Sequence, residues 1–156
     1  MNEQLLRATY GPQAQSILDA AQSVADAKTL GVSGAIIPVE GTFQGGHEVE
    51  NAYKARFADP CNPVRSNDVV RAIGKVIDSY TAARPGIRNI VILGDDRQIP
   101  MANIVDDTNF ANERTFAQDF SGNNESISAL LAGMYRTDDP YGTTAGISVR
   151  NHELFV

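Results

Sequence analysis

The sequence contains only one cysteine, Cys61, among 156 residues. A single cysteine excludes an intrachain disulfide and a four-cysteine zinc site. A chain of this length can nevertheless bury roughly two-thirds of its unfolded surface in one core. We therefore expect residues 1–156 to form a single domain that is stabilised by its hydrophobic core and needs no covalent cross-link.

Basic clusters, long apolar runs and phosphate-binding loops are also missing. The 13 basic and 19 acidic residues give a net charge of −6, which argues against a nucleic-acid partner. No stretch approaches the roughly 18 apolar residues of a membrane span. No Gly-x-Gly-x-x-Gly or Gly-Lys-Ser/Thr loop follows an expected strand, and the two carboxylates after Gly94 would repel phosphate. A nucleotide-binding domain of the Rossmann or flavodoxin type is therefore the weakest interpretation.

The rest of the chain is best understood around residues 87–100, IRNIVILGDDRQIP. Residues 90–93 form a short, largely β-branched apolar run that stops at Gly94 and two aspartates. This pattern predicts a strand buried on both faces, as in a parallel or mixed sheet covered by helices. Ligands of such sheets gather at the carboxyl ends of the strands, so we expect any chemistry to lie near Asp95 and Asp96.

The flanking segments alternate between expected helices and expected strands. Apolar spacing predicts a helix over about 13–30, a strand over 32–39, a short helix breaking into a turn within 51–65, and a helix from Ser66 or Asn67 to Tyr80. A further helix is expected after Asn123 or Asn124, and a last strand over 147–156. Helices between strands are typical of right-handed crossovers. We therefore predict an α/β fold of three layers, with a mostly parallel sheet and helices on both faces.

Residues 101–123 lack sustained periodicity and predict a long surface excursion or a site loop. We expect four aromatic residues to attach this excursion to the core: Phe110, Phe116, Phe120 and Tyr135. Arg97 and Arg114 are candidates for ion pairs with the nearby aspartates. The chain also stops within an apolar pattern at Val156, from which we expect an incomplete domain.

Several short motifs occur in an order that resembles a known family. They are residues 69–80, VVRAIGKVIDSY, then the 87–100 stretch, then Asp-Asp-Pro-Tyr-Gly at 138–142, and finally residues 152–156, HELFV. This order resembles the amino-terminal half of the caspase-like subdomain of gingipain-type cysteine peptidases, especially their large bacterial relatives. The matching positions are Gly94, Asp95, Ile99, Pro100, Asp138, Tyr141 and Gly142.

The resemblance covers about residues 13–156 and carries expectations of its own. It implies a peptidase whose catalytic His and nucleophilic Cys lie beyond residue 156, so that this chain is the non-catalytic front half. It implies a polypeptide substrate for the parent protein and an extracellular or cell-surface location. Two departures from the family pattern are a missing strand before Tyr10 and a missing strand after Val156.

Three aspartate pairs are the candidate metal ligands, because oxygen-rich loops suit calcium. Asp95, Asp96, Asp138 and Asp139 are the four residues that we expect to bind it, since gingipain-type domains bind calcium. Asp106 and Asp107 form the third pair. Strand-end capping, Asx-turns and solvation explain the same residues without a metal. None of the pairs follows EF-hand spacing.

A catalytic pair of Cys61 with His47 or His152 is disfavoured by the local sequence. Cys61 lies between two prolines close to Asp59, and a nearby carboxylate raises the pKa of a thiol, whereas a nucleophile needs it lowered. We expect Cys61 to be a structural thiol and His47 a surface residue. The alternative to the peptidase fragment is a complete but inactive binding or structural module, which could self-associate through residues 147–156.

Overall fold

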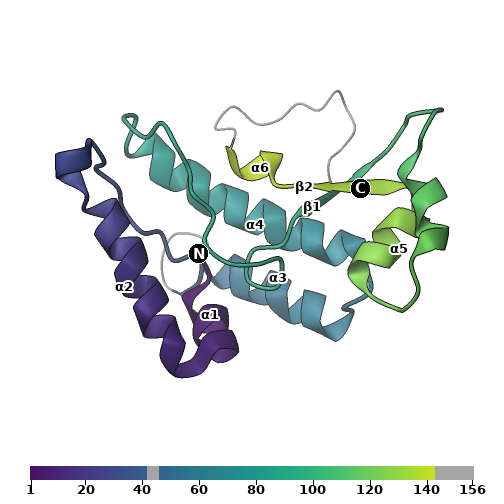
Figure 1. Ribbon diagram of the computed structural model, residues 1–156, viewed down its shortest axis with the longest axis horizontal. Coiled ribbons are helices and arrows are strands. Elements are labelled where there is room, and N and C mark those ends of the chain that lie inside the picture. The colour runs from purple at the N-terminus through teal and green to yellow at the C-terminus, as the bar shows by residue number, and fades with distance from the viewer. Residues whose placement is uncertain (42–45, 143–156) are drawn as a thin grey trace.

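The computed structural model describes residues 1–41 and 46–142. The elements in order are α1 Glu3–Tyr10, η1 Gly11–Gln13, α2 Ala14–Ala25, η2 Lys28–Leu30, α3 Gly46–Ala58, α4 Pro63–Ala82, β1 Ala102–Val105, η3 Glu113–Asp119, α5 Glu125–Leu131, β2 Met134–Thr137 and α6 Asp139–Gly142. The chain is thus an α/β protein in which helices predominate over a small sheet (Figure 1). Among the described residues, no helix combines the length and the apolar character that a bilayer crossing requires.

Helix α4 is the central element of the structure. Asn62 caps its first turn by accepting a hydrogen bond from the Val64 N–H (3.0 Å), and Pro63 occupies the first helical position, where no amide donor is needed. The cap therefore lies four residues before the Ser66 start that the sequence suggested. The apolar spacing that predicts this helix is confirmed, because six residues at that spacing are buried: Val69, Val70, Ile73, Val76, Ile77 and Tyr80.

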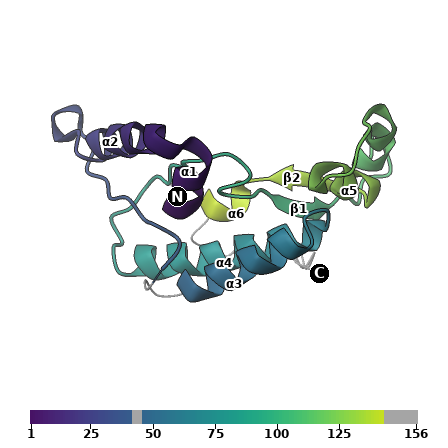
Figure 2. The ribbon, with the colours of Figure 1, turned by 90° about the horizontal axis from the view of Figure 1, so that it is seen from below.

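The main core forms on both sides of this stripe. Helix α3 packs beside α4 and contributes Val49 and Tyr53, and the segments after α4 contribute Ile99 and Ile104. Figure 2 shows α3 and α4 as one layer, with β1, β2 and α6 lying together against one face of that layer. A smaller cluster of Leu6, Ala14 and Leu18 joins α1 to α2.

The observed sheet has two antiparallel strands. In its register Ala102 lies opposite Thr137 and Val105 opposite Met134. This pair covers α4, and it places the end of β2 beside the start of β1. No strand is assigned over 32–39 or 90–93, so the parallel sheet that the sequence predicts is not formed within the described residues. Residues 147–156, the predicted final strand, lie outside the described part.

Helix α2 ends earlier than the periodicity suggests. It stops at Ala25, and a separate 3-10 turn precedes Gly31, whose φ of 78° provides the left-handed stop. The apolar spacing over 13–30 also misplaces the buried face, because Leu18 and Ala25 are buried whereas Val24 and Leu30 are exposed. In the described part of the chain α2 packs mainly against α1 and η1, so it has a narrow buried face.

The excursion after Pro100 is more ordered than the sequence indicates. It contains β1 and η3, and Asn124 caps α5 as predicted by accepting from the Ile127 N–H (3.0 Å). The expected role of its phenylalanines was wrong, because three of them are exposed: Phe110, Phe116 and Phe120. Tyr135 does pack against the main core.

Candidate functional site

The candidate site is the loop of residues 94–100, which follows the apolar run. Gly94 has a φ of 134°, and a Cβ built there would lie 2.9 Å from the Gln98 Cβ, so the position requires glycine. The fully buried Gln98 side chain accepts a hydrogen bond from the Asp95 N–H (2.7 Å) and donates to the Thr9 hydroxyl (2.9 Å). The loop is therefore closed on itself and joined to α1.

Two buried tyrosines hold the far end of this loop. The Tyr53 hydroxyl of α3 donates to the Gln98 carbonyl, and the Tyr141 hydroxyl of α6 donates to the Pro100 carbonyl (2.7 Å). Burial raises the pKa of both phenols above the ordinary tyrosine value. Both hydroxyls therefore remain protonated and act as donors to the loop at physiological pH.

Asp96 is joined to two arginines from distant segments. Arg136 on β2 donates to its Oδ1 and Arg56 on α3 lies 3.5 Å from its Oδ2, while the Met101 N–H donates to Oδ1 (2.9 Å). Burial raises the pKa of Asp96, but the hydrogen bond from Arg136, the Met101 N–H and the two positive charges outweigh it and lower the pKa overall. Asp96 is thus a fixed anion near neutral pH.

The arginines continue into a buried network. Arg56 and Glu125 are each only 7% exposed, and Arg56 donates to the Glu125 Oε2 through Nη2 (2.9 Å) and Nε (3.2 Å). Ser66 accepts a further bond from Arg56 (2.7 Å), and Asn103 donates to the Glu125 Oε1 (3.1 Å). The network therefore connects α3, α4, α5, β1 and the loop through charges that water cannot easily screen.

The four predicted metal ligands are not gathered into one site. Asp95 is half-buried and forms an ion pair with Arg97 (2.8 Å), whose hydrogen bond lowers the pKa of Asp95. Asp138 and Asp139 are exposed; they follow β2, and Asp139 begins α6. Within residues 1–41 and 46–142, no group of three or more His, Cys, Asp or Glu side chains could hold a metal ion.

The other candidate residues also lie apart from the loop. His47 is exposed, and its Nδ1 lies 3.3 Å from the Glu50 Oε2. Cys61 is a half-buried free thiol in the turn before α4, and the described contacts do not link it to a histidine. His152 lies outside the described residues. The predicted pair of Arg97 with an aspartate is confirmed, whereas Arg114 donates to the Leu131 carbonyl (3.1 Å) and forms no ion pair in the described part.

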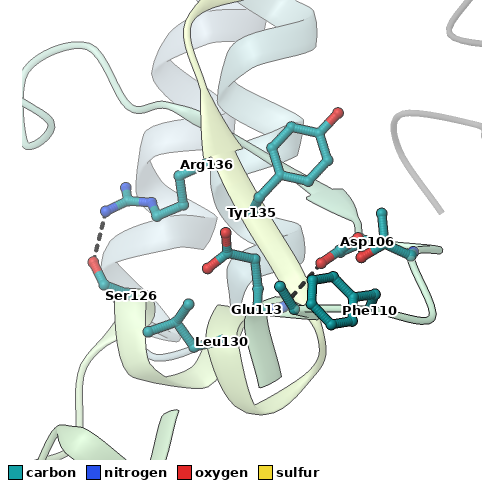
Figure 3. Close-up of a pocket in the computed structure, with 9 residues that line it drawn as sticks. Asp106, Phe110, Glu113, Ser126, Leu130, Tyr135 and Arg136 are labelled. Atoms are coloured by element: carbon teal, nitrogen blue, oxygen red, sulfur yellow. Dashed lines mark hydrogen bonds between the residues drawn. The ribbon is translucent and has the colours of Figure 1, made fainter. Parts of the chain in front are cut away.

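A hollow of about 660 Å³ lies on the outer side of β2, between α5 and the start of η3 (Figure 3). Its walls include the carboxylates of Asp106 and Glu113, the ring of Tyr135 and the guanidinium of Arg136. The Asp106 carboxylate accepts hydrogen bonds from the backbone N–H groups of Thr108 and Glu113, both at 2.9 Å. The Glu113 carboxylate has no ion pair within the described residues. Arg136 therefore connects this hollow to the buried network.

Sequence reasoning identified the loop but missed the residues that hold it. Arg56, Glu125, Asn103 and Arg136 are distributed over 81 positions of the chain, from 56 to 136, and no short motif links them. The one usable signal is Asn124 before Glu125, which marks a helix start and so predicts its position but not its partner. No family model, curated protein or solved structure matches the chain.

Proposed function

We propose that this chain is the non-catalytic front half of a gingipain-like cysteine endopeptidase. In this proposal its helices and loop belong to a larger three-layer domain with a mostly parallel sheet, and the catalytic His and Cys lie beyond residue 156. The chain supplies a rigid scaffold at the edge of a cleft that binds polypeptide. Peptide-bond hydrolysis belongs to the parent protein, and this chain alone turns over no peptide.

The observation that carries the proposal is the way in which Asp96 is held. A loop at the end of a β-branched run is where an α/β protein places its working groups. Here the loop carboxylate is compensated by Arg56 and Arg136, and its backbone is held by two tyrosine hydroxyls. Because the pKa of Asp96 is lowered, this carboxylate is a poor general acid or base near neutral pH. It can, however, position a neighbouring segment rigidly.

The coding sequence that follows residue 156 in the gene provides the first test. The proposal predicts that it continues with a Val-Gly-Arg or Ile-Gly-Arg turn, a His-Gly turn and a cysteine at the end of a strand. A stop codon directly after Val156 would contradict the proposal, because the chain would then have no source for the two catalytic groups. A continuation without the His and Cys would contradict it equally.

The second candidate is an inactive binding or structural module, and the hollow beside β2 favours it. Glu113 offers a carboxylate there without an ion pair in the described part, next to the rings of Tyr135 and Phe110. A cationic group with an apolar portion matches this lining. Calcium belongs to the same candidate, with Asp95, Asp96, Asp138 and Asp139 as the ligands proposed from the sequence.

The carboxylates of Asp95 and Asp96 are paired with arginines in the structure. Calcium would have to displace these arginines to gain the two carboxylates among its six to eight oxygen ligands. Titration of the chain with calcium, followed by thermal melting, measures this directly. Binding to the folded state raises the melting temperature by mass action. A calcium-dependent rise that disappears in Asp138→Asn and Asp139→Asn variants supports the metal site. A melting temperature that is independent of calcium removes it.

A further inference from the structure

Strand β2 has an open edge on the side away from β1. Asn103, which lies opposite Arg136 in the register, donates its N–H to the Asn67 Oδ1 (2.7 Å), and its carbonyl accepts from the Asn67 Nδ2 (2.8 Å). Asn103 and Arg136 are therefore a non-hydrogen-bonded pair of the antiparallel ladder. The bond from the Asp106 N–H to the Gly133 carbonyl (2.8 Å), three positions along, has the phase that this alternation requires. The N–H and carbonyl of Arg136 consequently point away from β1, and neither has a hydrogen-bond partner among the described residues.

The hollow beside β2 follows this open edge (Figure 3). Tyr135 and Arg136 both line it, although consecutive side chains of a strand point to opposite faces. A hollow that contacts both side chains passes around an edge of β2, and its described lining includes no residue of β1. Its volume of about 660 Å³ lies within the roughly 300–1,000 Å³ of ligand pockets. A segment that pairs with β2 would therefore place one of its side chains in the hollow.

The unbalanced charge in the hollow is negative. The one cation among its lining residues, Arg136, is engaged in the buried network through Asp96 and Glu125. The Asp106 carboxylate accepts backbone hydrogen bonds, whereas the carboxylate of Glu113 has no hydrogen bond or ion pair in the described part. An uncompensated carboxylate attracts a cationic ligand and repels an anionic one.

Phe110 provides an apolar wall on a loop that is already ordered. Its ring lines the hollow and is 90% exposed. The loop is closed by the Glu113 N–H, which donates to the Asp106 Oδ2 (2.9 Å), and by the Asn112 side chain, which donates to the Asp106 carbonyl (2.7 Å). Because these bonds fix the loop, a ligand does not have to order it, and the entropic cost of binding is reduced. The rings of Phe110 and Tyr135 suit the methylene stem of a long side chain whose charge reaches Glu113.

We propose that the open edge of β2 binds an extended segment of a partner polypeptide, whose lysine or arginine side chain lies in the hollow and pairs with Glu113. Main-chain hydrogen bonds to Arg136 supply affinity, and the hollow supplies specificity. Charge complementarity identifies this occupant, because residues 106–122 carry four acidic side chains and one basic side chain. The inference rests on the second candidate function, the binding module, and not on the peptidase fragment.

Fluorescence anisotropy with labelled peptides tests the proposal on the full chain. The probe is the heptapeptide Thr-Val-Thr-Lys-Thr-Val-Thr, and two matched probes carry norleucine or glutamate in place of the lysine. We expect the lysine probe to bind most tightly, and Glu113→Gln to weaken its binding on the order of tenfold or more, because a charge-assisted hydrogen bond is lost. Asp119→Asn is the matched control, since Asp119 is an exposed carboxylate of η3 outside the lining of the hollow, and it should leave the affinity unchanged.

Two further comparisons separate the parts of the site. Phe110→Ala should weaken binding of the lysine probe, whereas Phe116→Ala, which removes an exposed ring outside the lining, should not. This pair replaces the first if Glu113→Gln fails to fold. n-Pentylamine supplies the cation without a peptide backbone, and a lysine probe with N-methylated backbone amides cannot donate the hydrogen bonds of a strand. Both are expected to bind more weakly than the lysine probe.

Several results would overturn the proposal. They are failure of the lysine probe to bind, equal affinity for the lysine and norleucine probes, and equal affinity of Glu113→Gln and the unmodified chain. Binding of n-pentylamine as tight as that of the peptide, or binding that survives N-methylation, would overturn the strand pairing. None of these measurements depends on catalysis, so they leave the peptidase proposal to its own test, the sequence beyond residue 156.

Discussion

Replacing Glu125 by alanine removes the acceptor at the centre of the buried network. Arg56 would lose two hydrogen bonds, at 2.9 Å and 3.2 Å, and Asn103 would lose one at 3.1 Å. Arg56 is 7% exposed, so water cannot readily replace the lost acceptor. The side chain of Arg56 would keep Ser66 and the more distant Asp96 as partners.

The expected cost follows from this partial compensation. Breaking a buried ion pair by removing one partner lowers the free energy of unfolding by about 3–5 kcal/mol. Because Arg56 keeps some partners, we expect Glu125→Ala to cost about 3 kcal/mol, at the lower end of this range. For a chain of this size each kcal/mol corresponds to about 2–4 °C in melting temperature, so we expect a fall of about 6–12 °C. Urea denaturation and thermal melting measure both quantities.

Glu3→Ala is a matched control for this substitution. Glu3, like Glu125, is the first residue of a helix after an asparagine cap and pairs with an arginine, Arg7 (2.7 Å). Its pair is solvent-exposed, and such pairs contribute about 0.2–1 kcal/mol. The two variants therefore share the loss of a first-turn charge and differ in burial. Equal destabilisation by the two substitutions would refute the idea that the buried network stabilises the fold.

Three further predictions concern the loop itself. Because the folded-state pKa of Asp96 is lowered, its contribution to the free energy of unfolding is present above about pH 4 and is lost as the pH falls through that lowered pKa. Asp96→Asn should flatten this part of the profile of stability against pH, and an unchanged slope would contradict the prediction. Gly94→Ala should cost about 1–3 kcal/mol in urea denaturation, whereas Gly74→Ala, within α4 with open space at the Cβ, should stabilise. Tyr141→Phe should cost about 1–3 kcal/mol by leaving the Pro100 carbonyl without its donor, and a neutral effect would mean that this bond contributes nothing.

The helices show what sequence patterns can predict. The apolar stripe of α4 is uninterrupted over several turns, and its buried face could be read directly from residues 69–80. Asn124 likewise marks the start of α5, because capping is a local interaction between a side chain and the backbone two or three residues later. Where a helix has few neighbours, as α2 does, periodicity overstates both its length and its buried face.

Strands depend on partners, and this is where sequence reasoning differed from the structure. Residues 90–93 have the composition of a central strand, but a strand is defined by hydrogen bonds to another segment, and no described segment provides them. The β1–β2 pair was missed for the converse reason. Its strands have four residues each and carry polar side chains such as Asn103 and Arg136, so their alternation is weak.

The candidate site was predicted only in part for a similar reason. Gly94 and the two following aspartates indicate a loop at the end of an apolar run, which the structure contains. Their partners come from α3, α5 and β2, and long-range ion pairs such as Asp96 with Arg136 leave no local pattern in a single sequence. The aspartates therefore suggested a metal site, whereas in the structure arginines compensate the charges of Asp95 and Asp96.

We propose that this chain contributes scaffold and not catalysis to a peptidase. Hydrolysis of fluorogenic peptides by the complete gene product tests it most directly, with Cys61→Ala and His47→Ala variants measured beside the unmodified protein. We expect both variants of the complete gene product to retain hydrolysis and residues 1–156 alone to show none. Hydrolysis that is lost on Cys61→Ala would place the nucleophile within residues 1–156 and refute the scaffold role.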